Sequence, residues 1–449
     1  MKRRWTWGGI KWQLILIIAS VAWASVLWAA DPVPVMTLKE SIDLALKRSV
    51  LIQSAQEGVT ASRAQKDQAF TNFLPKLSTT YNYTYVSPKP VQEIPNFAPF
   101  PSELAVGTQD NYTWALEARQ PLFAGGSILA NYKANQYGID IARLDQQTSV
   151  LDTIRDVKVS YFTVLNAEKI VDVSKQAVQQ LEAHRDMAQN FFDVGLIPRN
   201  DLLKSEVELA HGKQSLVQAD NGMELARSKF NTVLRQAVDT PVKLEDILTY
   251  KPFELSMESC QKSALDNRPE MRLYNMRLEQ SREMVKIARS EYYPSINAVG
   301  HYERYGDNSG LNGSIYKGQE NWYLMAVASW NFWEWGKIHN KVDESRSREN
   351  QASLAIENIK DQITLQVRNA WLQLREAEKR IVVTQKAIEQ AEENFRIVTE
   401  QYKEQVATST DVLDAQTLLT RAKSDYENAL GDFSIAHAQL ERAMGLEGR

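Results

Sequence analysis

Residues 361–402 read DQITLQVRNAWLQLREAEKRIVVTQKAIEQAEENFRIVTEQY, and this stretch decides the fold. Its apolar residues recur every seven positions in two columns, the second offset from the first by four residues. The first column contains Ile363, Ala370, Ala377, Ala391 and Val398, and only Thr384 departs from it. The second contains Val367, Leu374, Ile381, Ile388, Phe395 and Tyr402. Alternating steps of four and three residues predict helices wound left-handedly around one another.

The helix that carries these columns is expected to be very long. Neither proline nor glycine occurs between Lys337 and Leu430, so no residue type in that span forces a break. From Lys337 to Tyr402 the helix would contain roughly 66 residues and measure on the order of 100 Å. Residues 405–410 then interrupt the columns, and Asp411 restarts a helix. The sequence therefore predicts a long helical hairpin within one elongated body.

The composition excludes several functional classes. The 449 residues carry a net charge of −4 and 24% charged residues, which gives no indication of nucleic-acid binding. One cysteine, Cys260, and five scattered histidines provide neither an intramolecular disulfide nor a recognisable metal site. No nucleophile stands with a base, and no phosphate-binding loop occurs. We therefore expect a protein that is not an enzyme and that uses no cofactor and no metal.

Residues 1–30 have the features of a secretory signal peptide. A basic head precedes an apolar core from Leu14 to Ala22, and cleavage could follow Ala24 or Ala30. An uncleaved membrane anchor is the alternative. No cysteine follows the apolar run, which excludes a lipid-anchored lipoprotein. Nothing later provides about 18 consecutive apolar residues. A mature protein that enters a membrane must therefore do so with strands.

The rest of the chain alternates helices and strands. Thr37 begins the first helix with Glu40 as its capping partner, and each strand alternates apolar and polar residues. The expected elements are a helix over 37–73, a strand over 77–85, a loop over 86–110, a strand over 111–120 ended by Pro121 and Gly125-Gly126, a helix to Val194, a turn over 195–200, a helix over 201–235 and a connector of unclear structure over 236–257.

From Glu258 onward the same order of elements recurs. At an offset of 219 residues Pro75 falls on Pro294, and after a shorter second loop the offset becomes 210, so that Gly126 falls on Gly336. We therefore divide the mature chain into two structural repeats, residues 31–257 and 258–449. Each repeat would contain a helix, two strands and a long helical hairpin.

Two strands per repeat give four strands per chain. Four strands cannot close a barrel, and an open sheet in a membrane leaves its edges unsatisfied, whereas three chains would supply twelve strands. Aromatic residues crowd the last predicted strand, as in the girdles of membrane barrels at a lipid–water boundary. They are Trp322, Tyr323, Trp330, Trp333 and Trp335. A small soluble sheet with a buried aromatic face is the alternative.

With these features the chain resembles the TolC-type outer-membrane channels of bacterial tripartite efflux pumps and type I secretion systems. The resemblance covers nearly all of the mature chain, and it rests on the duplicated order of elements together with several short motifs. The motifs are Leu74-Pro75-Lys76-Leu77, Tyr293-Pro294-Ser295-Ile296, Gln120-Pro121-Leu122-Phe123 with Gly126, Phe192-Asp193-Val194-Gly195, and Asp411-Val412-Leu413-Asp414-Ala415-Gln416.

The resemblance implies an α+β membrane protein that works as an exit duct. It implies a homotrimer with a twelve-stranded β-barrel in the outer membrane of a Gram-negative bacterium and a coiled-coil tunnel in the periplasm. Substrates would pass passively through an iris-like gate at the helical tips. The implied partners are a periplasmic adaptor (membrane fusion) protein, an inner-membrane pump or ABC transporter, and outer-membrane lipid. A periplasmic coiled-coil adaptor and a structural protein without a channel are the alternatives, and the substrate is not specified.

The candidate site residues lie at the two hairpin turns. Asp411 and Asp414 are three residues apart and share a helix face, so a trimer would gather six carboxylates, which attract cations. The resemblance makes them the pore entrance; a helix-capping role for Asp411 is the alternative. It also implies a gate latch of Asp201 and Tyr402. The residues expected to contact the adaptor are Gly195, Leu196, Ile197, Val406, Ala407 and Thr408.

Two residues depart from the pattern of the resemblance at the second turn. Gln405 stands where a glycine is often found, and Ala407 stands where some members carry a latch arginine. A salt bridge through position 407 is therefore not expected, and Arg199 is the candidate that could replace it.

Overall fold

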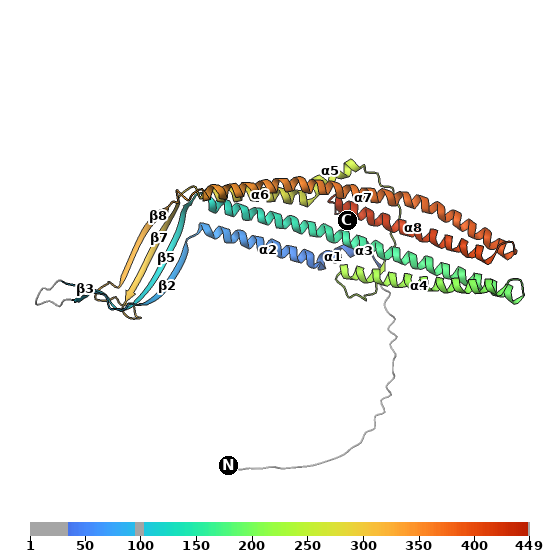
Figure 1. The fold of residues 1–449 in the computed structure, drawn as a ribbon, viewed down its shortest axis with the longest axis horizontal. Coiled ribbons are helices and arrows are strands. Elements are labelled where there is room, and N and C mark those ends of the chain that lie inside the picture. Colours follow the sequence, from blue (N-terminus) through green and yellow to red (C-terminus); the bar gives the residue numbers. More distant parts are fainter. Residues whose placement is uncertain (1–34, 95–102, 448–449) are drawn as a thin grey trace, which may run out of the picture.

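The computed structural model describes residues 35–94 and 103–447. They form an elongated molecule with a β-sheet at one end and the turns between the long helices at the other (Figure 1). The predicted signal peptide, residues 1–30, lies outside the described residues. Among the described residues, none of the helices combines the length and the apolar character needed to cross a bilayer.

Two long helical hairpins form most of the molecule. They consist of α3 (Ser127–Asp193) with α4 (Arg199–Val233), and α7 (Lys337–Lys403) with α8 (Ser409–Ala443). The predicted helix from Lys337 is confirmed at 67 residues. Its two columns face the interior, because their members pack in cores shared with α8. The buried members are Ile363, Val367, Ala370, Leu374, Ala377, Ile381, Ala391 and Tyr402.

The predicted helix over 37–73 is interrupted, so that part of the prediction was wrong. The structure has α1 (Leu38–Arg48), α2 (Val50–Phe70) and a short 3-10 helix, η1 (Thr71–Phe73). Ser49 is extended, with ψ at 118°, and its hydroxyl caps α2 by accepting from the N–H of Ile52. A serine competes well for such a role because its short side chain reaches the free N–H groups of a helix start. The capping box of Thr37 and Glu40 is present as predicted.

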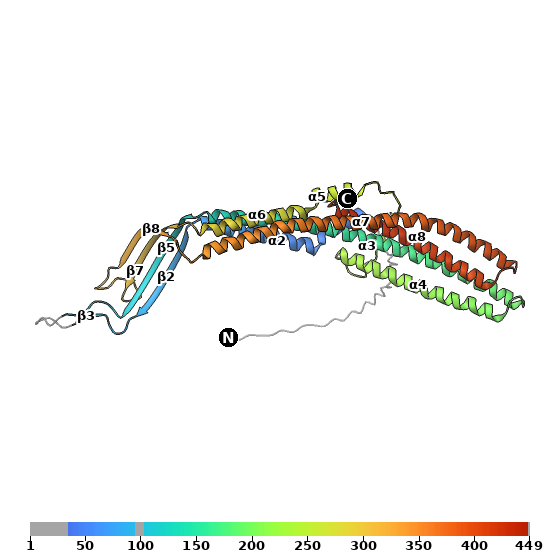
Figure 2. The same cartoon turned by 45° about the horizontal axis from the view of Figure 1, so that its top comes forward.

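The second half begins with a similar pair of helices. They are α5 (Met257–Asn267) and α6 (Pro269–Ser290), and the break falls at Arg268. Pro269 explains the break, because proline cannot continue a helix from the preceding turn but fits the first position of a new one. Figure 2 shows α2 and α6 running beside the long helices toward the sheet.

The sheet contains four antiparallel strands in the order β2-β5-β7-β8. Their bounds are Lys76–Tyr85, Asp110–Ala124, Ser295–Gly306 and Glu320–Ser329. The prediction that Pro121 ends its strand was wrong, because β5 continues to Ala124, but Gly125-Gly126 do follow the end of the strand as predicted. The register shifts between Pro121 and Phe123, and this irregularity lets the strand pass a residue that cannot donate to the ladder.

Two segments expected to lack regular structure contain short strands. Within the predicted loop over 86–110, β3 (Val91–Glu93) pairs with β4 (Glu103–Ala105) in an antiparallel manner. Within the connector, β6 (Lys243–Leu244) pairs in parallel with β1 (Val35–Met36). Strands of two or three residues carry too few positions for an alternating pattern, so the sequence does not reveal them.

The two faces of the four-stranded sheet differ in polarity. On one face Thr79, Leu116, Tyr302 and Trp322 lie side by side across the strands, and on the other Ser78, Glu117, His301 and Tyr323 do so. The aromatic crowd predicted for the last strand is only partly in it. The strand β8 ends at Ser329, so three of the five aromatic residues lie in the connection to α7. These are Trp330, Trp333 and Trp335.

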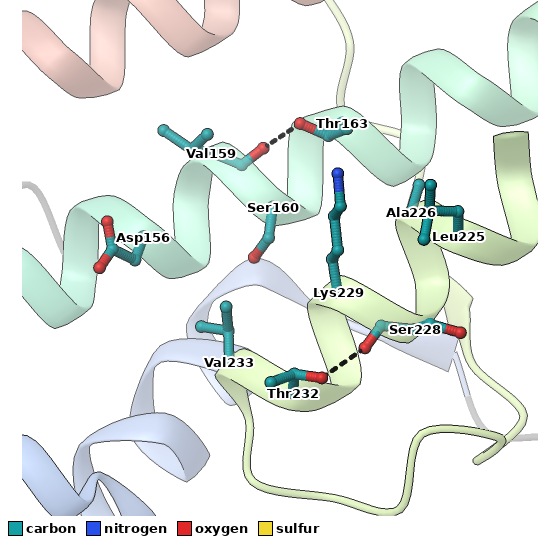
Figure 3. Close-up of a pocket in the computed structure, with 10 residues that line it drawn as sticks. All are labelled: Asp156, Val159, Ser160, Thr163, Leu225, Ala226, Ser228, Lys229, Thr232 and Val233. Atoms are coloured by element: carbon teal, nitrogen blue, oxygen red, sulfur yellow. Dashed lines mark hydrogen bonds between the residues drawn. The ribbon is translucent and has the colours of Figure 1, made fainter.

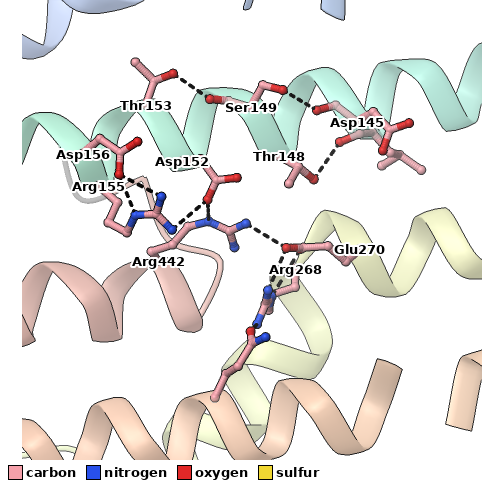
Figure 4. Close-up of polar contacts among 12 residues, drawn as sticks. Asp145, Thr148, Ser149, Asp152, Thr153, Arg155, Asp156, Arg268, Glu270 and Arg442 are labelled. Carbon is pink, nitrogen blue, oxygen red and sulfur yellow. Dashed lines mark hydrogen bonds and ion pairs between the residues drawn. The ribbon is translucent and has the colours of Figure 1, made fainter. Parts of the chain in front are cut away.

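A buried ionic network joins parts of the chain that are distant in the sequence (Figure 4). The guanidinium of Arg442 donates to Asp152 at 2.8 Å and to Glu270 at 2.8 Å. Glu270 also accepts from Arg268 at 2.7 Å, and Arg268 donates to Gln366 at 2.7 Å. The network therefore connects α3, the α5–α6 junction, α7 and the end of α8.

Candidate gate at the helical tips

The two tips turn with the same backbone geometry. At the end of α3, Gly195 has φ of 77°, and the N–H of Leu196 donates to the carbonyl of Phe191 at 2.8 Å. At the end of α7, Gln405 has φ of 61°, and the N–H of Val406 donates to Gln401 at 2.8 Å. Gln405 thus adopts the left-handed conformation that usually belongs to glycine, at a cost of roughly 1–2 kcal/mol.

Asp411 is a member of a helix cap. Its Oδ2 accepts from the N–H of Thr408 at 2.8 Å and from the Thr408 hydroxyl at 2.7 Å, and its own N–H donates to Thr408 Oγ1 at 3.3 Å. These bonds from Thr408 hold the pKa of the Asp411 carboxyl below its ordinary value. The side chain is exposed, so Asp411 is an ionised group at the surface of the tip. Thr408 is the N-cap, whereas the sequence had suggested Asp411 itself.

Asp414 lies one turn further along α8 and is exposed as well. It borders an open groove of about 390 Å³ between α4 and α8. Leu203 and Val207 line the α4 side of this groove, and Lys204 also reaches into it. The Nζ of Lys204 donates to the hydroxyl of Thr410 at 3.3 Å. One chain therefore presents both predicted entrance carboxylates to solvent.

Tyr402 is in the interior of the tip. Its side chain is 3% exposed, and its ring lies 5.0 Å from the imidazole of His184. Its buried hydroxyl meets no described residue at good hydrogen-bond geometry, so the predicted bond to Asp201 is not formed within this chain, although the Ser409 hydroxyl lies near enough to act on it. Burial raises the pKa of the Tyr402 phenol. Asp201 lies in the first turn of α4, where its carboxylate is 3.7 Å from Lys204 Nζ.

The residues predicted to contact an adaptor lie at the outer ends of the two turns. Leu196 and Val406 are 52% and 78% exposed, so each turn presents an aliphatic side chain to solvent. Gly195 and Thr408 are exposed too, whereas Ile197 and Ala407 are half-buried. Arg199, the candidate replacement for a latch arginine, is exposed at the first position of α4.

A second open groove lies between α3 and α4 at the far end of their hairpin and measures about 660 Å³ (Figure 3). Its threonines, Thr163 and Thr232, donate to carbonyls of their own helices at 2.7 and 2.9 Å. Lys229 and Asp156 are its charged lining residues. Across residues 35–94 and 103–447, no group of three or more His, Cys, Asp and Glu side chains is placed to hold a metal ion.

Residues 41–234 and 261–446 match the outer membrane efflux protein family. The chain belongs to this family. Membership places it among outer-membrane efflux channels and identifies transport as its broad role, in agreement with the resemblance seen in the sequence.

Individual outer membrane efflux proteins are similar to this one over most of its length. Nodulation protein T of Rhizobium leguminosarum bv. trifolii is 20% identical over 95% of this chain and 88% of that protein. The outer membrane protein TolC of Escherichia coli (strain K12) is 21% identical over 67% of this chain and 62% of TolC. The Campylobacter jejuni CmeC outer membrane channel has the same fold, with a TM-score of 0.78 and 18% identity over 91% of this chain and 85% of CmeC.

The structure of this outer membrane efflux protein also reveals tip residues that the sequence analysis missed. His184, Ser205 and Ser409 are buried together beneath Tyr402. His184 stands in an apolar column of α3 with Ala177 and Phe191 at seven-residue spacing. A histidine at an apolar position of this column is the sequence feature that could have identified His184 as a buried polar residue.

Proposed function

We propose that this protein forms a homotrimeric exit duct, with a twelve-stranded β-barrel in the outer membrane and a helical tunnel in the periplasm. The observation that carries this proposal is the open sheet. Among the described residues, β2 and β8 each pair along one edge only, and all ten residues of β2 are exposed. Edge strands left open in this way invite pairing with another chain. Pairing of β2 in one copy with β8 in the next closes a ring.

The aromatic residues between β8 and α7 support a membrane setting for the sheet. Trp330, Trp333 and Trp335 are 59%, 67% and 88% exposed, and they lie at the junction of sheet and helices. Tryptophan is favoured where an apolar layer meets water, because its ring is amphipathic. We therefore place the membrane boundary at this junction, with the apolar face of Leu116 and Trp322 toward lipid.

Backbone geometry supports an internal duplication at the offset of 210 residues. Gly126 and Gly336 precede α3 and α7 with φ of 87° and 81°. Three further pairs at this offset have positive φ, although one member of each is not glycine. They are Gly125 with Trp335, Gly195 with Gln405, and Arg235 with Gly445. Positive φ is uncommon outside glycine, so its recurrence in register favours two copies of one ancestral unit.

The gate is proposed to lie at the tips. Three copies of Asp411 and Asp414 would gather six ionised carboxylates at the narrow end of the tunnel, and the exposed apolar side chains of Leu196 and Val406 would meet the adaptor. An inner-membrane pump or ABC transporter would supply the energy. The latch of Asp201 and Tyr402 remains a prediction for the assembled channel, since the Tyr402 hydroxyl is free to gain a partner there.

Light scattering and planar-bilayer recording on the detergent-extracted protein test this proposal together. Three chains of 51.1 kDa, less their signal peptides, give a protein mass of about 143 kDa after correction for bound detergent. We expect that mass and discrete conductance steps from the same preparation. A monodisperse monomer that still formed pores would contradict closure by three chains. A trimer without conductance, even after the tip residues are deleted, would contradict the duct.

A further inference from the structure

A buried hydrogen-bonded cluster joins the two hairpins just above the tips. His184 lies on α3, Ser205 on α4, and Ser409 at the first position of α8. The Nε2 of His184 is 2.9 Å from Ser409 Oγ, which is 3.1 Å from Ser205 Oγ. The three residues are 7%, 1% and 1% exposed. Among the residues that the structure describes, Ser409 is therefore the one residue of the α7–α8 hairpin with hydrogen bonds to both helices of the other hairpin.

The donor and acceptor of each hydrogen bond in the cluster can be assigned by starting from Ser205. The Ser205 hydroxyl donates to the carbonyl of Asp201 at 3.1 Å, so its oxygen accepts the proton of Ser409. Ser409 has then used its single proton, and its oxygen must accept from the Nε2–H of His184. This arrangement fixes the tautomer of the imidazole. It also means that removing Ser409 leaves the buried Nε2–H of His184 without its partner, while Ser205 keeps its bond to the carbonyl of Asp201.

Tyr402 closes the cluster from the side of α7. Its ring lies 5.0 Å from the imidazole and 5.5 Å from the ring of Phe191. The other polar contacts between the hairpins are either more exposed than this cluster or further from the tip. Lys204 to Thr410 is an exposed bond at 3.3 Å, and Gln416 to Gln180 at 2.7 Å lies further up the helices. The buried cluster is consequently the contact best protected from water at the tip.

We propose that His184, Ser409 and Ser205 act as an internal latch within each protomer, which holds the α7–α8 hairpin against the α3–α4 hairpin and keeps the tip closed. These are positioning residues, since none of them is exposed enough to meet a substrate. The inference rests on the proposed duct, because a latch has meaning only where the hairpins separate during opening. It differs from the latch of Asp201 and Tyr402 in its residues and its chemistry.

Acid is expected to weaken this latch. Burial lowers the pKa of His184 to about 4, and separation of the hairpins would expose the imidazole and return its pKa toward the ordinary 6.5. Opening therefore takes up a proton, and acid favours the open form as the pH falls from about 6.5 to 4. Other titratable groups surround the cluster on every element. They are Tyr402 on α7, Asp201 and Lys204 on α4, Asp411 on α8, and the mutually paired Arg185 and Asp186 on α3.

Three variants of the full-length trimer separate this latch from general packing. His184→Leu removes the donor to Ser409, and His184→Gln retains an N–H donor that does not titrate. His211→Gln is the matched control, because His211 is exposed on α4. In planar bilayers at pH 7.5, we expect His184→Leu to raise the ratio of open to closed channels roughly fivefold. We expect His184→Gln to stay closed and to lose the opening that wild type and His211→Gln show between pH 6.5 and 4.5.

Hydrogen exchange at the first turns of α4 and α8 provides a second readout that requires no conduction. Faster exchange in His184→Leu, with protection retained in His184→Gln, supports the latch. Equal exchange and equal open-to-closed ratios in wild type and His184→Leu would overturn it, while the duct would stand if all variants conduct. Absence of conductance in every variant, after removal of the tips, counts against the duct. The exchange data then decide separately whether the cluster holds the hairpins together.

Discussion

The Nε of Arg442, in the last turn of α8, lies 2.8 Å from the Oδ1 of Asp152, in the middle of α3 (Figure 4). The same guanidinium reaches Glu270 at the start of α6, and only 10% of its side chain is exposed. Glu270 is in turn paired with Arg268. Charges buried in this way are stable only while each keeps its partner. The network therefore fixes the relative positions of the two hairpins near the C-terminal end of α8, whereas the candidate gate lies at the N-terminal end of that helix.

Replacing Arg442 by Met should destabilise the protein by about 3 kcal/mol, because Glu270 would lose one of its two cationic partners while it stays buried. The urea midpoint, followed by circular dichroism, measures the change. Arg421→Met is the matched control on the same helix, since Arg421 is 80% exposed and its pair with Asp425 is 3.9 Å long. It should shift the free energy of unfolding by less than about 0.5 kcal/mol. Equal shifts for both variants would argue against the network.

The carboxyl of Glu270 predicts a pH range for this stability. Burial alone would raise its pKa, but the hydrogen bonds and charges of Arg268 and Arg442 outweigh burial and lower the pKa to about 2. The unfolded chain takes up the proton first, at about 4.5, so the contribution of Glu270 is complete above that pH and is lost as the pH falls toward 2. It amounts to roughly 3 kcal/mol. Glu270→Gln should flatten the dependence of the urea midpoint between pH 4.5 and 2, and an unchanged slope would contradict this assignment.

The faces of the sheet predict opposite outcomes for two neighbouring substitutions. Leu324 shares its face with Ala118 and Gly300, whereas Met325 shares its face with Arg119. Arginine at Leu324 should impair assembly in the outer membrane, because a charge on the lipid side costs roughly 2–4 kcal/mol near the midplane. Arginine at Met325 lies at the same depth on the polar side and should be tolerated. The trimer recovered from outer-membrane fractions checks both, and equal recovery would mean that the faces are assigned wrongly.

The parts of the fold that the sequence predicted well are those with long repeating patterns. Eleven column residues over about six heptads leave one face for burial, so the bounds of α7 and the start of α8 were predictable to within a residue or two. Ser49 was not predictable in the same way. A serine within an apolar helical pattern can lie in the helix or end it. Here Ser49 separates two helices, because its hydroxyl accepts a hydrogen bond from the N–H of Ile52.

The candidate site was predicted as a location more than as a set of contacts. Asp411 and Asp414 are exposed at the tip, but the cap formed by Thr408 and Asp411 depends on where the turn ends. The partners of Ser409 lie 225 and 204 residues away in the chain. Contacts between residues so distant depend on the packing of two hairpins, which no local pattern specifies.

Exchanging the residues at the two turns should have opposite effects. Gln405→Gly removes the cost of a side chain at φ of 61°, and the greater freedom of glycine in the unfolded chain offsets part of that gain, so the second tip should be stabilised by roughly 0.5–1 kcal/mol. Gly195→Gln should destabilise the first tip by a similar amount, and for conformational reasons alone, because a Cβ there would meet no atom within 4 Å. Hydrogen exchange at the ends of α7 and α3 measures each change. Effects of the same sign would show that side-chain contacts outweigh backbone conformation at these turns.

The carboxylates of Asp411 and Asp414 should govern ion selectivity. The role of Asp411 in its helix cap decides which variant to use, since alanine would remove an acceptor of the Thr408 N–H and disturb the turn as well as the charge. Asparagine at both positions removes the charge and retains an acceptor.

We expect the double variant to lose cation selectivity in planar bilayers and to be blocked by trivalent cations roughly tenfold more weakly, because a ring of like charges concentrates counter-ions at a narrow entrance. Asp425→Asn, an exposed change higher on α8, should leave both properties unaltered. Wild-type selectivity and wild-type block in the double variant would show that the two carboxylates are ordinary surface residues. That conclusion would hold whether or not His184, Ser409 and Ser205 form a latch.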